Sequence, residues 1–150
     1  MKTKNSTWKV VLIAIAIIIA VALMAVFGVQ SYMNRAISME EQVSTAKSDV
    51  NVQEKRRVDL LGNLADCVKN YDKYEYDTLK TIVDGRSSDD DKAAEIKTSI
   101  KAVSEAYPEL KSNENYKQLM NELATTENLI ANYRENYNKQ VKIYNGYVRA

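Results

Sequence analysis

The sequence predicts an all-α protein, in which an N-terminal transmembrane helix is followed by an antiparallel up-and-down four-helix bundle. Three observations support this fold class. An unbroken apolar run of 18 residues extends from Val10 to Phe27, apolar residues recur downstream at steps of three and four, and the 150 residues include only four Gly and one Pro. Helices with one apolar face bury it against each other, and a scarcity of Gly and Pro indicates few turns.

The apolar run has the length of a membrane span. Gly28 and Val29 extend it to 20 residues, and ~20 helical residues at ~1.5 Å each cross a hydrocarbon core of ~30 Å. A cleaved signal peptide is the alternative, because Ala20-Val21-Ala22 fits a small-x-small cleavage site, although it lies inside the run. We therefore expect a short basic tail at 1–9, a transmembrane helix at 10–29 and a helical bundle at 30–150.

The charges that flank the run predict its orientation. The nine residues before it contain three basic side chains and no acidic one: Lys2, Lys4 and Lys9. Basic flanks stay in the cytoplasm. We therefore expect a single-pass protein of the cell membrane, with a cytoplasmic N-terminus, a bundle outside the membrane, and residues 10–29 in contact with the lipid bilayer.

Breaks in the helical pattern divide the polar part of the chain. Gly85 begins a turn that runs to Asp91, and Pro108 disfavours helix at Tyr107. Ser112 or Asn113 can cap the last helix. The predicted helices cover 31–57, 59–85, 90–107 and 113–148. The first boundary has an alternative, in which three long helices form and the first is kinked near Gly62.

The last predicted helix has the most regular apolar stripe. Its members lie three or four positions apart, close to a heptad seam of coiled-coil type, and they are rich in Tyr in the second half: Tyr116, Leu119, Leu123, Thr126, Ile130, Tyr133, Tyr137, Val141, Tyr144 and Val148. A tyrosine in such a seam can bury its ring and keep its hydroxyl in water. This stripe predicts that the helix packs along another helix for most of its length.

Composition excludes several functional classes. The chain has no His and a single Cys, Cys67, which removes His-based catalysis, His-based metal centres and an internal disulfide. A formal net charge of +1 gives no overall attraction to nucleic acid. We therefore expect no enzymatic activity, no catalytic residue, no cofactor, no metal and no nucleic-acid partner. Cys67 is interpreted as a small buried or half-buried side chain.

The densest polar block is a candidate interaction site. It consists of Arg56, Arg57, Asp59 and Asn63. Arginines at a helix end could bind an anion or a partner, but we favour a structural role, in which the block caps a helix and forms salt bridges.

Two further sets of polar residues are candidates. Tyr137 and Asn138 recur seven residues later as Tyr144 and Asn145. We favour Tyr rings in the seam and Asn side chains that pair with neighbouring helices and set register, over a polar ladder for a ligand. Glu127 lies near the seam, so its carboxylate would need a partner if buried. The candidates for that partner are Arg56, Arg57 and Arg134.

Residues 52–75 and 106–145 resemble the LemA family of bacterial membrane proteins. The matching features follow one another in the family's order: the membrane segment, Arg56-Arg57-x-Asp59-Leu60-x-x-Asn63-Leu64, Tyr107-Pro108-Glu109-Leu110, Thr126-Glu127, and the two Tyr-Asn pairs. The resemblance implies a LemA-like four-helix bundle on one anchor and no catalytic activity. Gly62 stands where the family usually has Pro, and relatives usually continue into an apolar, aromatic tail that this chain lacks.

Two functions remain in competition. The first is a non-enzymatic interaction or scaffold protein of the cell envelope, whose helical faces bind a protein partner or a second copy. The alternative is an extracytoplasmic sensory or small-ligand-binding module, in which tyrosines line a pocket.

Overall fold

The longest element is α1 (Lys4–Val68), one α-helix of 65 residues that carries the apolar run near its start and core residues at its end. The computed structural model describes residues 4–85 and 90–149. Four more helices follow: α2 (Lys73–Asp84), α3 (Asp90–Ala106), α4 (Pro108–Ser112) and α5 (Glu114–Arg149). The described residues contain no strand, so the predicted all-α class is confirmed. Lys2 and residues 86–89 of the predicted turn lie outside the described residues.

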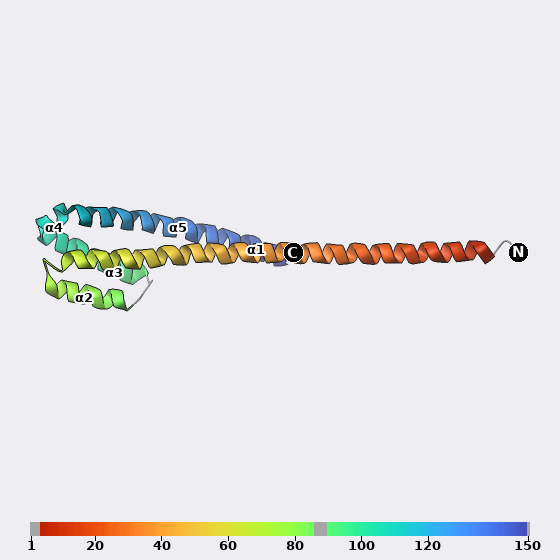
Figure 1. Ribbon diagram of the computed structural model, residues 1–150, viewed down its shortest axis with the longest axis horizontal. Coiled ribbons are helices and arrows are strands. Elements are labelled where there is room, and N and C mark those ends of the chain that lie inside the picture. Colours follow the sequence, from red (N-terminus) through yellow and green to blue (C-terminus); the bar gives the residue numbers. More distant parts are fainter. Residues whose placement is uncertain (1–3, 86–89, 150) are drawn as a thin grey trace.

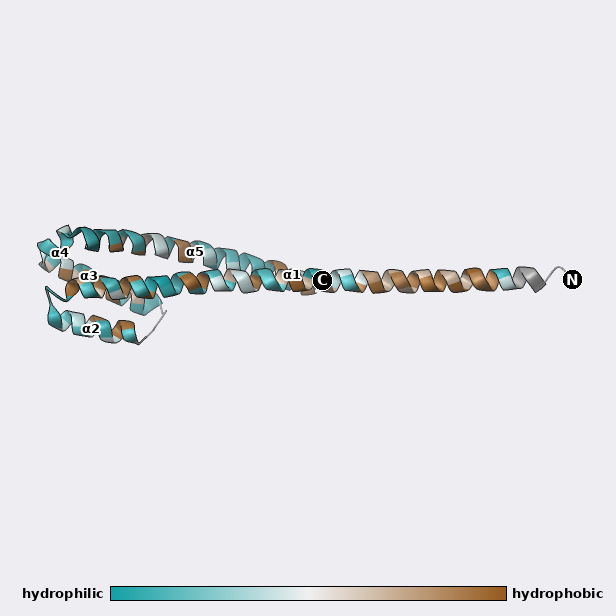
Figure 2. Cartoon of the chain, in the orientation of Figure 1, coloured by the Kyte–Doolittle hydropathy of each residue, from teal (hydrophilic) through white to brown (hydrophobic). Residues whose placement is uncertain are grey.

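The helices form a long antiparallel hairpin with a thicker far end. α5 runs back along α1, and α2 and α3 cover only the part of this pair that is farthest from the N-terminus (Figure 1). The first half of α1 extends alone beyond the end of α5, and the apolar run within this half is hydrophobic on all sides (Figure 2). None of its most apolar 18-residue window is buried, and its length and composition are compatible with a membrane span.

The predicted first boundary is wrong. α1 continues through residues 57–59 and through Gly62, so the chain does not turn at 58 and runs on as one helix there, as in the alternative prediction. The chain turns instead at 69–72, where the backbone N–H groups of Tyr71 and Asp72 both donate to the carbonyl of Val68. Asp72 then caps α2 by accepting a hydrogen bond from the Glu75 N–H at 3.0 Å. A side-chain cap fixes this helix start without Gly or Pro.

The later boundaries agree with the sequence prediction. α2 ends at Asp84, before Gly85, and α3 covers 90–106. The predicted turn at 107–113 contains the one-turn helix α4, with Pro108 at its first position. Asn113, rather than Ser112, caps α5, because its Oδ1 accepts a hydrogen bond from the Tyr116 N–H at 3.1 Å.

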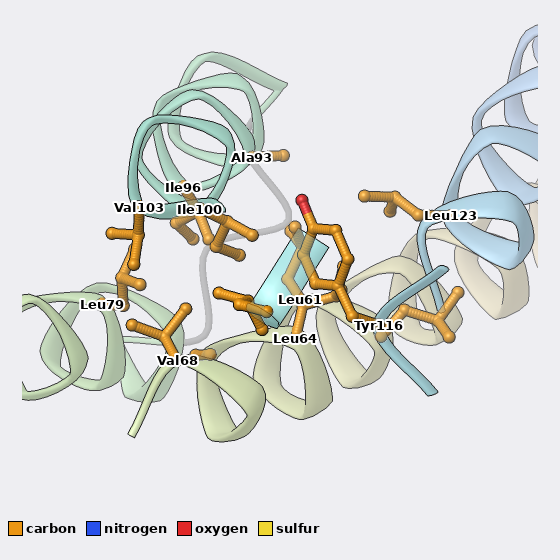
Figure 3. Packing of buried hydrophobic residues seen from close by; sticks show 13 residues of the cluster. Leu61, Leu64, Val68, Leu79, Ala93, Ile96, Ile100, Val103, Tyr116 and Leu123 are labelled. Atoms are coloured by element: carbon orange, nitrogen blue, oxygen red, sulfur yellow. The ribbon is translucent and has the colours of Figure 1, made fainter. Parts of the chain in front are cut away.

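One hydrophobic core joins all five helices at the far end. Leu64 and Val68 of α1, Leu79 of α2 and Ile100 of α3 are fully buried, and Leu123 of α5 is 1% exposed (Figure 3). The remaining members of the cluster are Leu60, Leu61, Ala65, Ala93, Ile96, Val103, Leu110 and Tyr116. The predicted stripes therefore face one another. Closer to the apolar run, only Ala46 and Val50 of α1 are buried, since α1 and α5 are the only helices of the described chain there.

Gly62 offers a stabilising substitution. It lies inside α1, and a Cβ built there meets only the Val83 Cγ1 atom of α2, at 3.6 Å, which is ordinary van der Waals contact. Replacing Gly62 with Ala is expected to raise the free energy of unfolding by about 1 kcal/mol, because Gly costs about that much relative to Ala inside a helix. Urea denaturation of the detergent-solubilised protein measures this gain, and an equal or lower midpoint would contradict it.

Candidate functional site

A charged cluster fastens three helices together beside the core. It consists of Glu54 and Arg57 of α1, Asp90 of α3 and Arg134 of α5, and is called the Asp90 cluster below. Asp90 Oδ1 accepts a hydrogen bond from Arg57 Nη1 at 2.7 Å. Its Oδ2 accepts one from Arg134 Nη1 at 2.6 Å. Arg134 also donates to Glu54 Oε1 at 2.6 Å. One carboxylate therefore joins α1, α3 and α5.

Arg57 and Asp90 of the Asp90 cluster differ greatly in burial. The Arg57 side chain is 6% exposed, while the Asp90 side chain is 54% exposed. A guanidinium taken out of water requires an anionic partner, and Asp90 at the start of α3 supplies it. Asp90 is also favourably placed for the positive end of the α3 dipole. The arrangement therefore compensates a buried charge and is better suited to holding helices together than to catalysis.

The two arginines shift the acid–base equilibrium of Asp90. Hydrogen bonds from Arg134 and then Arg57 stabilise the carboxylate and lower the pKa of Asp90 to about 2. The pKa of Arg134 is raised, chiefly by its hydrogen bonds to Asp90 and Glu54. Both groups are therefore fully charged at neutral pH.

Acid is expected to weaken the Asp90 cluster. Because the pKa of Asp90 is about 2 in the folded protein and 3.8 for the ordinary group, its stabilising effect is complete above about pH 4 and is lost as the pH falls towards about 2. The loss is on the order of 1 kcal/mol, because the side chain is more than half exposed. Urea denaturation at pH 5, 4, 3 and 2, compared with Asp90→Asn, isolates this contribution. Equal pH profiles for both proteins would contradict it.

A second ion pair joins α3 to α5. Lys97 Nζ donates to Glu127 Oε2 at 2.5 Å, and both side chains are about one-third exposed. Glu127 was expected to pair with Arg56, Arg57 or Arg134 if it were buried, and that expectation is wrong. The partner is a lysine on α3, since α3 packs next to this part of α5. Thr126, which precedes Glu127, is buried as the seam predicted.

The predicted polar block does not form one site. Arg57 points to Asp90, whereas Arg56 is exposed and lies 3.7 Å from Glu122 of α5. Asp59 is exposed on α1. Asn63 is also exposed and lines a separate groove. Because α1 continues past residue 57, Arg56, Asp59 and Asn63 lie along one exposed side of the helix and Arg57 lies on its buried side. The predicted helix cap is therefore wrong, while salt bridges at Arg56 and Arg57 are present.

The predicted tyrosines and asparagines of α5 also lie on different sides of their helix. Tyr137 and Tyr144 are half-buried along the seam with α1, as predicted. Asn138 and Asn145 are exposed, so the expected pairing with neighbouring helices is wrong. Each Asn is one position past a seam residue, which turns its side chain about 100° away from the neighbouring helix.

An open groove at the far end of the hairpin is lined by amides. It has a volume of about 430 Å³ and is called the asparagine groove; its lining residues are Asn63, Asp66, Cys67, Asn70, Tyr71, Leu110, Asn113, Asn115 and Leu119. Asn115 Nδ2 donates to Cys67 Sγ at 3.4 Å. Burial is the larger effect on this thiol and raises the pKa of Cys67. A raised pKa keeps the thiol protonated and unreactive, in agreement with the interpretation of Cys67 as half-buried.

A pair of tyrosines joins the two ends of the hairpin. The rings of Tyr32 on α1 and Tyr147 on α5 stack with centroids 4.7 Å apart. The Tyr32 hydroxyl donates to the Tyr147 carbonyl at 3.0 Å, and Arg35 lies over the Tyr147 ring, 5.6 Å from its centroid. The predicted site residues include neither Tyr32 nor Tyr147. The signal available for Tyr147 was its position three residues after the seam residue Tyr144, a step that keeps it near the same side of the helix.

Comparison with protein families identifies a match that covers most of the chain. A sequence model of the LemA family matches residues 46–150. This range holds the whole core, the Asp90 cluster and the asparagine groove. A search of curated proteins found no match.

Proposed function

Because the chain belongs to the LemA family, we propose that it is a membrane-anchored, non-enzymatic interaction protein of the bacterial cell envelope. In this proposal residues 1–9 form a cytoplasmic tail, residues 10–29 span the membrane, and the helices of 30–150 lie outside it. There α1, α2, α3 and α5 act as a LemA-like up-and-down bundle that binds an envelope protein or a second copy.

The observation that carries the proposal is the continuity of α1. One helix connects the exposed apolar segment to the core without a linker. From Val29 to Asn63, 34 residues at ~1.5 Å each place the asparagine groove about 50 Å from the end of the apolar run. A rigid rod that holds a folded end at a fixed height is suited to presenting a surface to a partner.

The chemistry of the described surface also favours binding over catalysis. The charged groups of the Asp90 cluster are engaged with each other, and the pKa shifts of Asp90 and Arg134 keep these two side chains ionised rather than poised near neutrality. The asparagine groove instead presents amides, which donate and accept hydrogen bonds without titrating. Such a surface suits recognition of peptide or side-chain polar groups.

Photo-crosslinking in intact cells tests the proposal. A photoreactive residue at Asn115 in the groove is expected to capture a reproducible protein partner, or a second copy of this chain. The matched control is the same residue at Asn138, which is exposed on the same helix but far from the groove. If position 115 captured nothing beyond what position 138 captures, the groove would not be a partner surface.

Orientation requires a separate experiment. The basic tail predicts that protease added to intact spheroplasts cleaves the 30–150 region. Protection of that region, with cleavage only after lysis, would reverse the proposed orientation and confine the partner search to the cytoplasm.

A further inference from the structure

We infer that the C-terminal end of α5 docks on the membrane surface and binds acidic lipid headgroups. This inference rests on the proposed membrane span at 10–29. It concerns the patch formed by Arg35 of α1 with Lys142, Ile143, Val148 and Arg149 of α5, called the juxtamembrane patch below. The patch is built around the stacked pair Tyr32 and Tyr147.

The tyrosine stack fixes the depth of this end of α5. Tyr32 is three residues beyond Val29, the end of the apolar run, and this distance corresponds to about 4.5 Å along a helix. Tyr147 lies at the same level, because its ring stacks on Tyr32 and each hydroxyl hydrogen-bonds to the other residue's carbonyl. The headgroup region on each side of a ~30 Å hydrocarbon core is roughly 5–7 Å thick. The last turn of α5 therefore lies within it.

The exposed side chains at this depth suit a lipid interface. Val148 on α5 and Met33 on α1 are 48% and 56% exposed at this level. Ile143 and Ile37, which are 43% and 52% exposed, follow about 6–8 Å farther from the apolar run. Figure 2 shows the end of α5 lying beside α1 where the polar part of the hairpin gives way to the apolar segment. Exposed apolar side chains beside tyrosines are unfavourable in water but favourable at the boundary between headgroups and acyl chains.

Charge selects the kind of lipid. After Glu135, the chain carries three basic side chains and no acidic one up to residue 150: Lys139, Lys142 and Arg149. Arg35 adds a guanidinium next to Tyr147. Basic residues at a membrane surface are attracted to anionic phosphates, and long Lys and Arg side chains can extend from a buried stem to reach them. Phosphatidylglycerol-type headgroups therefore match the patch better than neutral ones.

Fluorescence depth measurement tests the docking. The chain contains one Trp, so Trp8→Phe gives a background without tryptophan. In this background Val148→Trp reports on the juxtamembrane patch. Tyr74→Trp, at a residue of α2 that is 83% exposed, is the matched control far from the membrane. In phosphatidylglycerol vesicles with brominated acyl chains, emission from position 148 is expected to fall about two-fold or more, while emission from position 74 stays unchanged.

A second pair of variants tests the role of charge. Lys142→Gln together with Arg149→Gln is expected to abolish the difference in quenching between phosphatidylglycerol and phosphatidylcholine vesicles. Gln at Lys117 and Lys111, which are exposed at the far end, is the control and should preserve that difference. Equal quenching in both lipids for the starting protein would overturn the selection of acidic headgroups.

Vesicle flotation separates this inference from the proposed anchor. If every variant floats with vesicles but Trp at position 148 is not quenched, the anchor stands and the docking is wrong, and the patch then faces water or a protein. If the full chain does not float, the membrane anchor fails and the docking fails with it. Flotation together with quenching at position 148 supports both.

Discussion

Replacing Leu64 with alanine is expected to lower the free energy of unfolding by about 2–5 kcal/mol. Leu64 is fully buried in the core where α1, α2, α3 and α5 meet (Figure 3). Its removal leaves a cavity that helices fastened by the Asp90 cluster cannot close completely. The loss of helical circular dichroism with urea measures the effect in detergent, since the apolar half of α1 stays in the micelle.

The matched control for Leu64 lies on the same helix. Val52 is 59% exposed, so Val52→Ala should change stability by no more than ~0.5 kcal/mol. Equal effects of Leu64→Ala and Val52→Ala would mean that the far end of α1 does not unfold as part of one core.

Replacing Asp90 with alanine is expected to cost about 3 kcal/mol, because it removes a carboxylate that accepts hydrogen bonds from the buried Arg57 and from Arg134. This exceeds the effect of acid, since a protonated Asp90 can still accept hydrogen bonds and alanine cannot. Thermal or urea denaturation at pH 7 measures the loss. Asp59→Ala is the matched control, because Asp59 is an exposed carboxylate on α1 and should change stability by ~0.5 kcal/mol or less.

A double variant identifies the cause of the loss. Arg57→Met combined with Asp90→Ala is expected to recover part of the stability that Asp90→Ala loses, because the buried charge and its partner are then both gone. If the double variant were as unstable as the sum of the single ones, the cost would come from another source, such as the start of α3.

The sequence predicted those features of the fold that depend on residues within a single helix. The apolar run, the seam of α5 and the start of α5 near residues 112–113 depend on neighbours within a few positions, and periodicity and capping chemistry report on these. The turn at 69–72 has a local signal too: Asp72 and Glu75 have the spacing of an N-cap and its third residue. The prediction instead placed the boundary next to Arg56 and Arg57, with a kink near Gly62 as the alternative.

The candidate site depended on contacts that no local pattern contains. Asp90 is 33 positions from Arg57 and 44 from Arg134, and Glu54 is 80 positions from Arg134. One trace of these contacts is visible in the sequence. Arg57 falls between Val50 and Leu64 on the buried side of α1, and a charge at such a position requires a partner. The identity of that partner depends on how α3 and α5 are arranged around α1.

The unbroken α1 has a mechanical consequence in the proposed membrane arrangement. With no joint between bilayer and core, any tilt of the membrane segment is also a tilt of the far end. Membrane helices tilt by ~20° on average, and over a lever of about 50 Å this moves the asparagine groove sideways by about 17 Å. Local bilayer thickness, by setting the tilt, would then determine the area of envelope that each molecule can reach.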